Sequence, residues 1–135
     1  MYDVRAKENT RMRPWWWGAI VLVTDQVSKW YIPVVVSNRG SVFGVGAGWA
    51  WDVISATVLC VLGWLLMRSH KAGERVGLSL ILAGGLSNFI DRIFWGAVRD
   101  FIYWPVIRVY GNVADVWLGV GVILVTWSYC RKTAT

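Results

Sequence analysis

Four long apolar runs most constrain the fold of this chain. They cover approximately residues 15–31, 51–67, 76–95 and 113–129, and short polar stretches separate them. A helix needs about 20 mostly apolar residues to cross the hydrocarbon core of a bilayer. The chain also holds eleven tryptophans, a residue that is enriched at membrane interfaces. The sequence therefore predicts an all-α membrane protein, in which a single integral membrane domain forms a four-transmembrane-helix bundle.

Basic residues are unevenly distributed among the segments outside these runs. Nine of the fourteen Lys and Arg residues lie within residues 1–14, within the 68–75 loop or after residue 130. Segments rich in Lys and Arg stay in the cytoplasm, so we expect both termini there and residues 1–14 to form a disordered tail. This asymmetry explains the net charge of +6 better than nucleic-acid binding does.

Two connections are then expected outside the cytoplasm. Residues 32–50 are rich in Val and Gly around Asn38-Arg39-Gly40, which predicts a strand, a turn and a second strand. Residues 97–112 alternate aromatic and β-branched residues around Pro105. This pattern predicts an extracytoplasmic interfacial segment between the third and fourth helices.

Acidic residues gather at the expected outer ends of the helices. Asp25, Asp91 and Asp115 belong to three different runs, and Asp100 follows the third run. Ionisable side chains in a membrane are costly, which makes them functional candidates. If Asp100 and Asp115 meet in a dry site, they would share a proton and could activate water against a peptide bond. Structural polar residues at a helix rim, or an ion pathway, are the alternatives.

Several polar neighbours of these acids have structural interpretations. Asp25 and Lys29 are four residues apart, so they can pair on one helical face or face a substrate. Asp91 beside Arg92 is most simply a structural ion pair. Ser28 next to Lys29 suggests a serine–lysine hydrolase only weakly, because adjacent helical residues point about 100° apart.

Two asparagines and a group of small residues complete the candidate site. Asn88 is expected to hydrogen-bond between helices, and Asn112 can cap the fourth helix. No metal or cofactor is expected, because the two cysteines and the lone histidine lack the spacing of metal ligands. The small residues that would let helices approach closely are Gly77, Ser79, Ala83, Gly84 and Ser87.

Four sequence blocks, taken together, resemble the bacterial lipoprotein signal peptidases, or signal peptidase II. The blocks are TDQVSK (24–29), NRGSVFG (38–44), GGLSNFIDR (84–92) with AVRDF (97–101), and GNVAD (111–115). They occur in the family's order across nearly the whole chain. The positions that carry the resemblance are Asp25, Lys29, Asn38, Gly40, Phe43, Gly84, Asn88, Asp91, Arg92, Asp100, Asn112, Ala114 and Asp115.

The resemblance implies an intramembrane aspartyl endopeptidase of the bacterial inner membrane. Such an enzyme cuts a prolipoprotein on the N-terminal side of a diacylglyceryl-modified cysteine. The resemblance implies that Asp100 and Asp115 are catalytic and that the other matched positions bind substrate or support the site. It also implies a β-cradle at residues 32–50 and a mobile cover at residues 101–111. The expected partners are the lipidated precursor and membrane lipid, with the chain acting as a monomer.

Three positions depart from the family's pattern. Ser87 stands where a glycine is usual, and Gly111 stands where an aromatic residue is usual. Arg99 replaces a small apolar residue beside Asp100, and a guanidinium aimed at the two acids would weaken the acid partner. In an extended strand, however, neighbouring side chains point to opposite faces, so Arg99 would avoid the site. A catalytically impaired relative that binds lipidated peptides is therefore one alternative. A small ion- or proton-conducting bundle that uses the acids as a relay is another.

Overall fold

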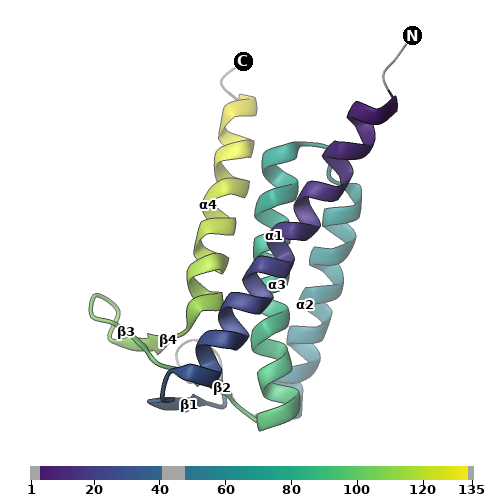
Figure 1. Cartoon of the computed structure of the whole chain (residues 1–135). Helices are drawn as coiled ribbons and strands as arrows, with labels where there is room; N and C mark the ends of the chain where they lie inside the picture. The colour runs from purple at the N-terminus through teal and green to yellow at the C-terminus, as the bar shows by residue number, and fades with distance from the viewer. Residues whose placement is uncertain (1–3, 41–47, 134–135) are drawn as a thin grey trace.

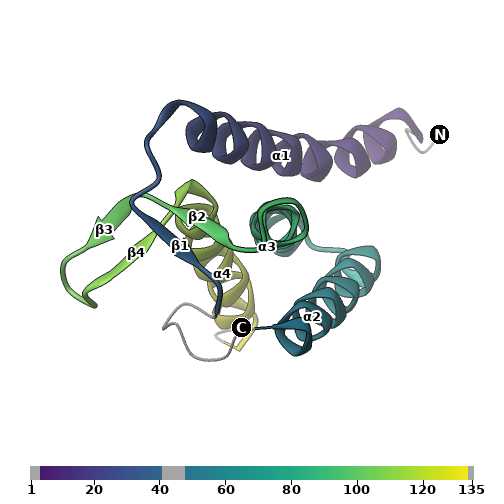
Figure 2. The same cartoon turned by 90° about the horizontal axis from the view of Figure 1, so that it is seen from below.

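The computed structural model describes the backbone of residues 4–40 and 48–133 and the side chains of residues 15–40 and 48–131. Phe43, one of the matched positions, lies outside the described residues. Four helices account for most of the described chain: α1 (Val4–Tyr31), α2 (Trp49–Arg68), α3 (Ala72–Trp95) and α4 (Val113–Thr133). α3 lies in the middle and packs against the other three (Figure 2). The predicted helical bundle is thus confirmed.

Three of these helices are long and apolar enough to cross a membrane. They are α2, α3 and the Val113–Arg131 part of α4. α1 is the longest helix of the described chain, at 28 residues. It begins at the same end of the bundle at which α4 ends (Figure 1).

The prediction of a disordered tail was wrong for residues 4–14. α1 begins at Val4 and continues through Pro14. The segment before the proline consists largely of good helix formers, namely Arg, Ala, Lys, Glu and Met. Their intrinsic propensity makes the helix eleven residues longer than its apolar run, and the single backbone hydrogen bond that Pro14 removes does not end it.

Four short strands lie at the other end of the bundle (Figure 1). β1 (Val36–Asn38) pairs antiparallel with β2 (Val98–Asp100), with Val36 opposite Asp100. β3 (Ile102–Trp104) and β4 (Val109–Gly111) form an antiparallel hairpin. The first strand expected within residues 32–50 is confirmed, whereas residues 41–47, where a second strand was expected, lie outside the described part of the chain. The described partner of β1 comes instead from the segment after α3.

Two glycine positions determine how that end of the bundle is built. Gly96 ends α3 in the left-handed conformation, with φ 68°, and its N–H donates to the carbonyl oxygen of Arg92 at 3.0 Å. Gly84 lets α3 touch α4, because a Cβ there would lie 2.9 Å from both Ala114 O and Leu118 Cγ. In lipid, such small residues permit close helix packing. These glycines fix the start of β2 and the start of α4 relative to α3.

Candidate active site

Asp100 and Asp115 are both hydrogen-bonded to Asn112. Asp100 is the last residue of β2 and is only 2% exposed, whereas Asp115 lies in the first turn of α4. The side-chain amide of Asn112 donates to Asp100 Oδ1 at 2.8 Å, and its backbone N–H donates to Asp115 Oδ2 at 2.9 Å. The structure thus brings together two acids that come from separate elements.

The start of α4 holds Asp115 in place. Asn112 Oδ1 accepts from the backbone N–H of Asp115 at 3.2 Å, so the two residues cap each other reciprocally. The next free amide of the helix end, that of Ala114, donates to Asp25 Oδ1 at 2.8 Å. The predicted helix cap at Asn112 is confirmed, and it also orients one of the two acids.

Asn88 connects this cap to the rest of the bundle. Its amide nitrogen donates to Asp115 Oδ1 at 3.1 Å. Its oxygen accepts from Asn112 Nδ2 and from Lys29 Nζ, both at 3.0 Å. Asn88 therefore does more than join two helices, because it links the acid pair to a buried cation.

That cation belongs to a buried ion network. Lys29 Nζ lies 2.6 Å from Asp25 Oδ2 and 3.0 Å from Asp91 Oδ2, and all three residues are at most 3% exposed. The predicted pairing of Asp25 with Lys29 is confirmed. Ser28 donates instead to the backbone oxygen of Asp25 at 2.7 Å, so it does not form a serine–lysine pair. Buried charges of this kind depend on their partners to offset desolvation.

The predicted ion pair between Asp91 and Arg92 was wrong. The cation paired with Asp91 besides Lys29 is Arg99, whose Nη2 lies 2.9 Å from Asp91 Oδ1 and whose backbone N–H donates to Asp91 Oδ2 at 3.0 Å. Arg92 donates to the backbone oxygen of Gly40 at 2.6 Å. Adjacent side chains diverge on a helix, and the turn at the end of α3 returns Arg99 to Asp91.

Electrostatics distinguish Asp100 from an ordinary carboxylate. Burial, together with the charge of Asp115, raises the pKa of Asp100 to about 6, while hydrogen bonds from Asn112 and Asn38 and the charge of Lys29 partly offset the rise. Asn38 is held in turn by the backbone N–H of Gly40, which donates to its Oδ1 at 3.0 Å. Asp100 can therefore take up or release a proton near neutral pH.

Comparison with known proteins identifies the family. A sequence profile described as signal peptidase (SPase) II matches residues 18–131. This chain belongs to the signal peptidase II family. The lipoprotein signal peptidase of Geobacillus kaustophilus is 36% identical, over 84% of this chain and 90% of that protein. The lipoprotein signal peptidase of Polynucleobacter necessarius is 32% identical, over 84% of this chain and 86% of that protein.

A solved structure has the same fold. A bacterial membrane enzyme determined by the in meso method at 2.3 Å resolution superposes with a TM-score of 0.78 and 26% identity. The match covers 90% of this chain and 89% of that one. Membership of the signal peptidase II family thus agrees with the fold, and it makes this chain a peptidase of the bacterial inner membrane that acts on lipoproteins.

Arg99, which departs from the family's pattern, points away from the two acids. It is the middle residue of β2, so its side chain and that of Asp100 lie on opposite faces. Its guanidinium donates to Gln26 Oε1 at 3.0 Å and stacks over the ring of Trp95 at 5.0 Å. The extended arrangement that would spare the site is therefore the one observed.

Gln26 is the residue of this network that sequence reasoning missed. Its amide nitrogen donates to Asp91 Oδ1 at 3.1 Å and to Ser87 Oγ at 2.9 Å. Ser87 donates in turn to Asp25 Oδ2 at 2.7 Å. The signal that could have revealed Gln26 is an uncharged polar residue beside Asp25 within the first predicted membrane span.

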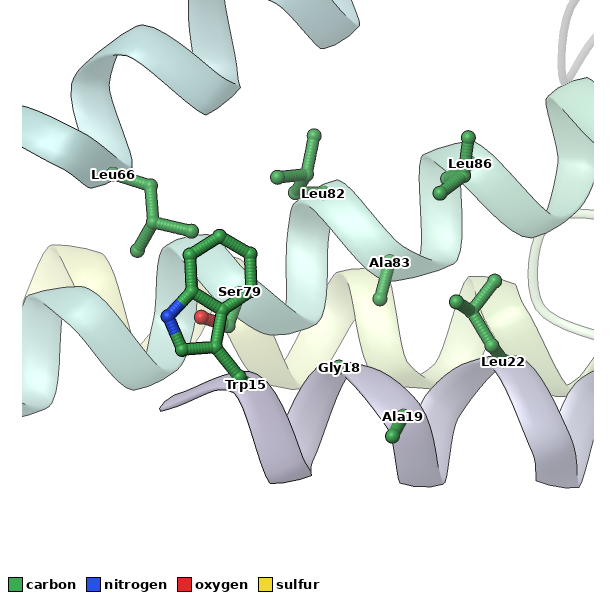
Figure 3. Close-up of a pocket in the computed structure, with 9 residues that line it drawn as sticks. All are labelled: Trp15, Gly18, Ala19, Leu22, Leu66, Ser79, Leu82, Ala83 and Leu86. Carbon is green, nitrogen blue, oxygen red and sulfur yellow. The ribbon is translucent and has the colours of Figure 1, made fainter. Parts of the chain in front are cut away.

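A mostly apolar cavity lies outside this network. It has a volume of about 250 Å³ between α1, α2 and α3, and none of its lining residues is ionisable (Figure 3). The residues lining the cavity are Trp15, Gly18, Ala19, Leu22, Leu66, Ser79, Leu82, Ala83 and Leu86.

Among the described residues, no group of three or more His, Cys, Asp or Glu could hold a metal ion.

Proposed function

We propose that this chain is an intramembrane aspartyl endopeptidase that removes signal peptides from diacylglyceryl-modified prolipoproteins. The observation that carries the proposal is the arrangement of Asp100 and Asp115, two carboxylates hydrogen-bonded to a single asparagine. Burial and the neighbouring charge keep one of them protonated up to about pH 6. Such a pair combines an acid and a base in one site.

The reaction needs a single water molecule and no covalent intermediate. One carboxylate takes a proton from water while the oxygen of that water attacks the scissile carbonyl carbon. The other carboxylate gives a proton to the departing amide nitrogen as the C–N bond breaks. Cleavage on the N-terminal side of the lipidated cysteine leaves a free amine on the cysteine and a new carboxylate on the signal peptide. Asn88 and Asn112 hold the acids for this exchange through the contacts described above.

The supporting residues divide into three roles in this proposal. Asp25, Lys29 and Asp91 form the buried network that carries Asn88 and the start of α4. Arg92 ties residues 38–40 to α3, which keeps Asn38 near Asp100. β1 and β2 act as the cradle under the substrate peptide, and the β3–β4 hairpin acts as its cover. The residues with supporting or substrate-binding roles are Asp25, Lys29, Asn38, Gly40, Phe43, Gly84, Asn88, Asp91, Arg92, Asn112 and Ala114.

All four helices cross the inner membrane in this proposal. α1 runs alongside α3 (Figures 1 and 2), which supports its role as a fourth span. The basic residues concentrated where α1 begins, between α2 and α3, and after residue 130 support a cytoplasmic location for both termini. The strands and the acid pair then lie near the outer leaflet, and the chain works as a monomer.

A groove beside the acids suits a lipidated substrate. It has a volume of about 370 Å³ between α2, α3 and α4, and its lining is mostly apolar. Asn88 and Arg92 also line it, so it is continuous with the polar network. Apolar parts of the substrate can therefore lie at membrane depth while the peptide bond reaches the acids.

The test is cleavage of a diacylglyceryl-modified precursor by the purified chain. We expect wild-type protein to cut, and Asp100→Asn and Asp115→Asn each to lose at least a thousandfold in kcat while remaining folded. Asp52→Asn is the matched control, because Asp52 lies in the first turn of α2 outside the network and should keep full activity. Wild-type kcat in either dyad variant, or an inactive Asp52→Asn, would show that the wrong acids were chosen.

The alternative of an ion relay receives less support. A relay needs ionisable groups spaced along the membrane normal. Asp25, Asp91, Asp100 and Asp115 instead belong to one connected network at the strand end of the bundle. An impaired relative is also less favoured, because Arg99 is engaged elsewhere.

A further inference from the structure

A second cavity opens directly beside Asp115. It has a volume of about 270 Å³ and lies between the β3–β4 hairpin and α4. Trp104, Ile107 and Val109 line it from the hairpin, and Leu118 lines it from α4. Asp115 is the one acidic residue in this lining, so the cavity is an apolar extension of the acid pair.

The absence of a side chain at position 111 brings a tryptophan against the acid. A Cβ at Gly111 would lie 2.7 Å from Asp115 Oδ2 and also 2.7 Å from Trp104 Nε1. The carboxylate oxygen and the indole nitrogen are therefore at most twice that distance apart. Any larger residue at position 111 would have to displace one of them, and Asp115 is already held by Asn112 and Asn88.

The hairpin that carries Trp104 is fixed to both acids. Its first strand follows Asp100 after a single residue, and its last residue, Gly111, immediately precedes Asn112. Phe101 N–H donates to Gly111 O at 2.9 Å, which closes the base of the hairpin. Trp104 lies opposite Val109 in the hairpin register. The indole therefore has a defined position relative to the catalytic pair.

We propose that Trp104 is a specificity-determining residue, whose indole forms one wall of a subsite for an apolar side chain of the substrate peptide next to the scissile bond. The inference rests on the proposed function. An extended peptide rises about 3.3 Å per residue. When its scissile carbonyl carbon lies beside Asp115, the side chains that flank the scissile bond therefore lie close to Asp115 as well. The apolar cavity that continues from Asp115 is where one of those side chains would be buried. Gly111 supports the subsite by leaving room for the indole.

The experiment measures kcat and KM for a diacylglyceryl-modified precursor with an apolar residue beside the cleavage site. Trp104→Ala should raise KM at least tenfold with kcat changed by less than threefold, because a wall is lost but the acids stay in place. Trp104→Phe should return KM to within threefold of wild type, since it keeps a flat apolar ring. Gly111→Ala should raise KM at least threefold by displacing the indole.

Gly119→Ala is the matched control, because it adds the same methyl group to α4 where no atom lies within 4 Å. It should leave both constants unchanged. A folded Trp104→Ala with KM within twofold of wild type, or one that loses kcat alone, would overturn the subsite. If Trp104→Ala does not fold, Gly111→Ala with wild-type KM would overturn it instead. A wild-type chain that cuts no precursor would refute the proposed function itself, and the subsite with it.

Discussion

Replacing Asp100 by asparagine should stabilise this protein at neutral pH while abolishing its activity. The raised pKa of Asp100, about 6, means that the folded site prefers the protonated, uncharged side chain. At pH 7.5 the wild-type site must bury a charge that the unfolded chain exposes to solvent. Asparagine has no such charge, and its side-chain oxygen can still accept the hydrogen bond that Asn112 donates to Asp100 Oδ1 at 2.8 Å.

The magnitude follows from the two pKa values. The folded group titrates at about 6 and the ordinary group at 3.8, which at 1.36 kcal/mol per pKa unit amounts to about 3 kcal/mol. Because the folded state binds this proton more tightly, the contribution of Asp100 to wild-type stability is greatest below pH 3.8 and decreases as the pH rises towards 6. Asp100→Asn lacks this loss, so its advantage should grow from near zero at pH 4 to about 3 kcal/mol at pH 7.5.

The assay is equilibrium unfolding in mixed detergent micelles, followed by far-UV circular dichroism at pH 4, 5, 6 and 7.5. Asp52→Asn serves as the control, because it makes the same substitution at a carboxylate outside the network. The reasoning would be refuted if Asp100→Asn were no more stable than wild type at pH 7.5. An advantage that grew on acidification would refute it equally, because the sign would be reversed.

Three further outcomes follow from the same contacts. Cleavage should fall as the pH rises above about 6, because Asp100 then loses the proton that the pair gives to the departing amide nitrogen; a rate that stays constant from pH 6 to pH 8.5 would contradict this. Lys29→Met should cost about 3–5 kcal/mol in an unfolding titration, since Asp25 loses the cation 2.6 Å from its carboxylate, and wild-type stability would count against a structural role for the pair. Gly84→Ala should cost about 1–3 kcal/mol and slow cleavage by pushing α4 away from α3, whereas Gly63→Ala, with no atom within 4 Å of its added methyl group, should do neither.

The helices and the cap of the fourth helix could be predicted from the sequence alone. Apolar runs of sufficient length predict helices in a membrane protein, and the spacing of Asn112 and Asp115 is that of a reciprocal cap. Asp25 and Lys29 pair as their four-residue spacing predicts. These features are local, because each depends on residues within a single segment of the chain.

The remaining features of the fold and the site depend on contacts between segments that are far apart in the sequence, so they could not be predicted from local patterns. Asp91 pairs with Arg99, rather than with its neighbour Arg92, only because the turn at Gly96 brings β2 back towards α3. The strand at residues 36–38 finds its described partner sixty residues later, which no turn signal near Gly40 could indicate. The helix through Pro14 was missed because its polar composition was interpreted as disorder, although its residues favour a helix.

Single and double substitutions of the dyad test the central claim most directly. Two acids that share one proton act as a unit, so removing the second should cost little once the first is gone. We predict that Asp100→Asn, Asp115→Asn and the double variant cut a diacylglyceryl-modified precursor at residual rates within tenfold of one another, each at least a thousandfold below wild type. Losses that multiply in the double variant would mean that the two carboxylates act independently, and that result would contradict the shared site.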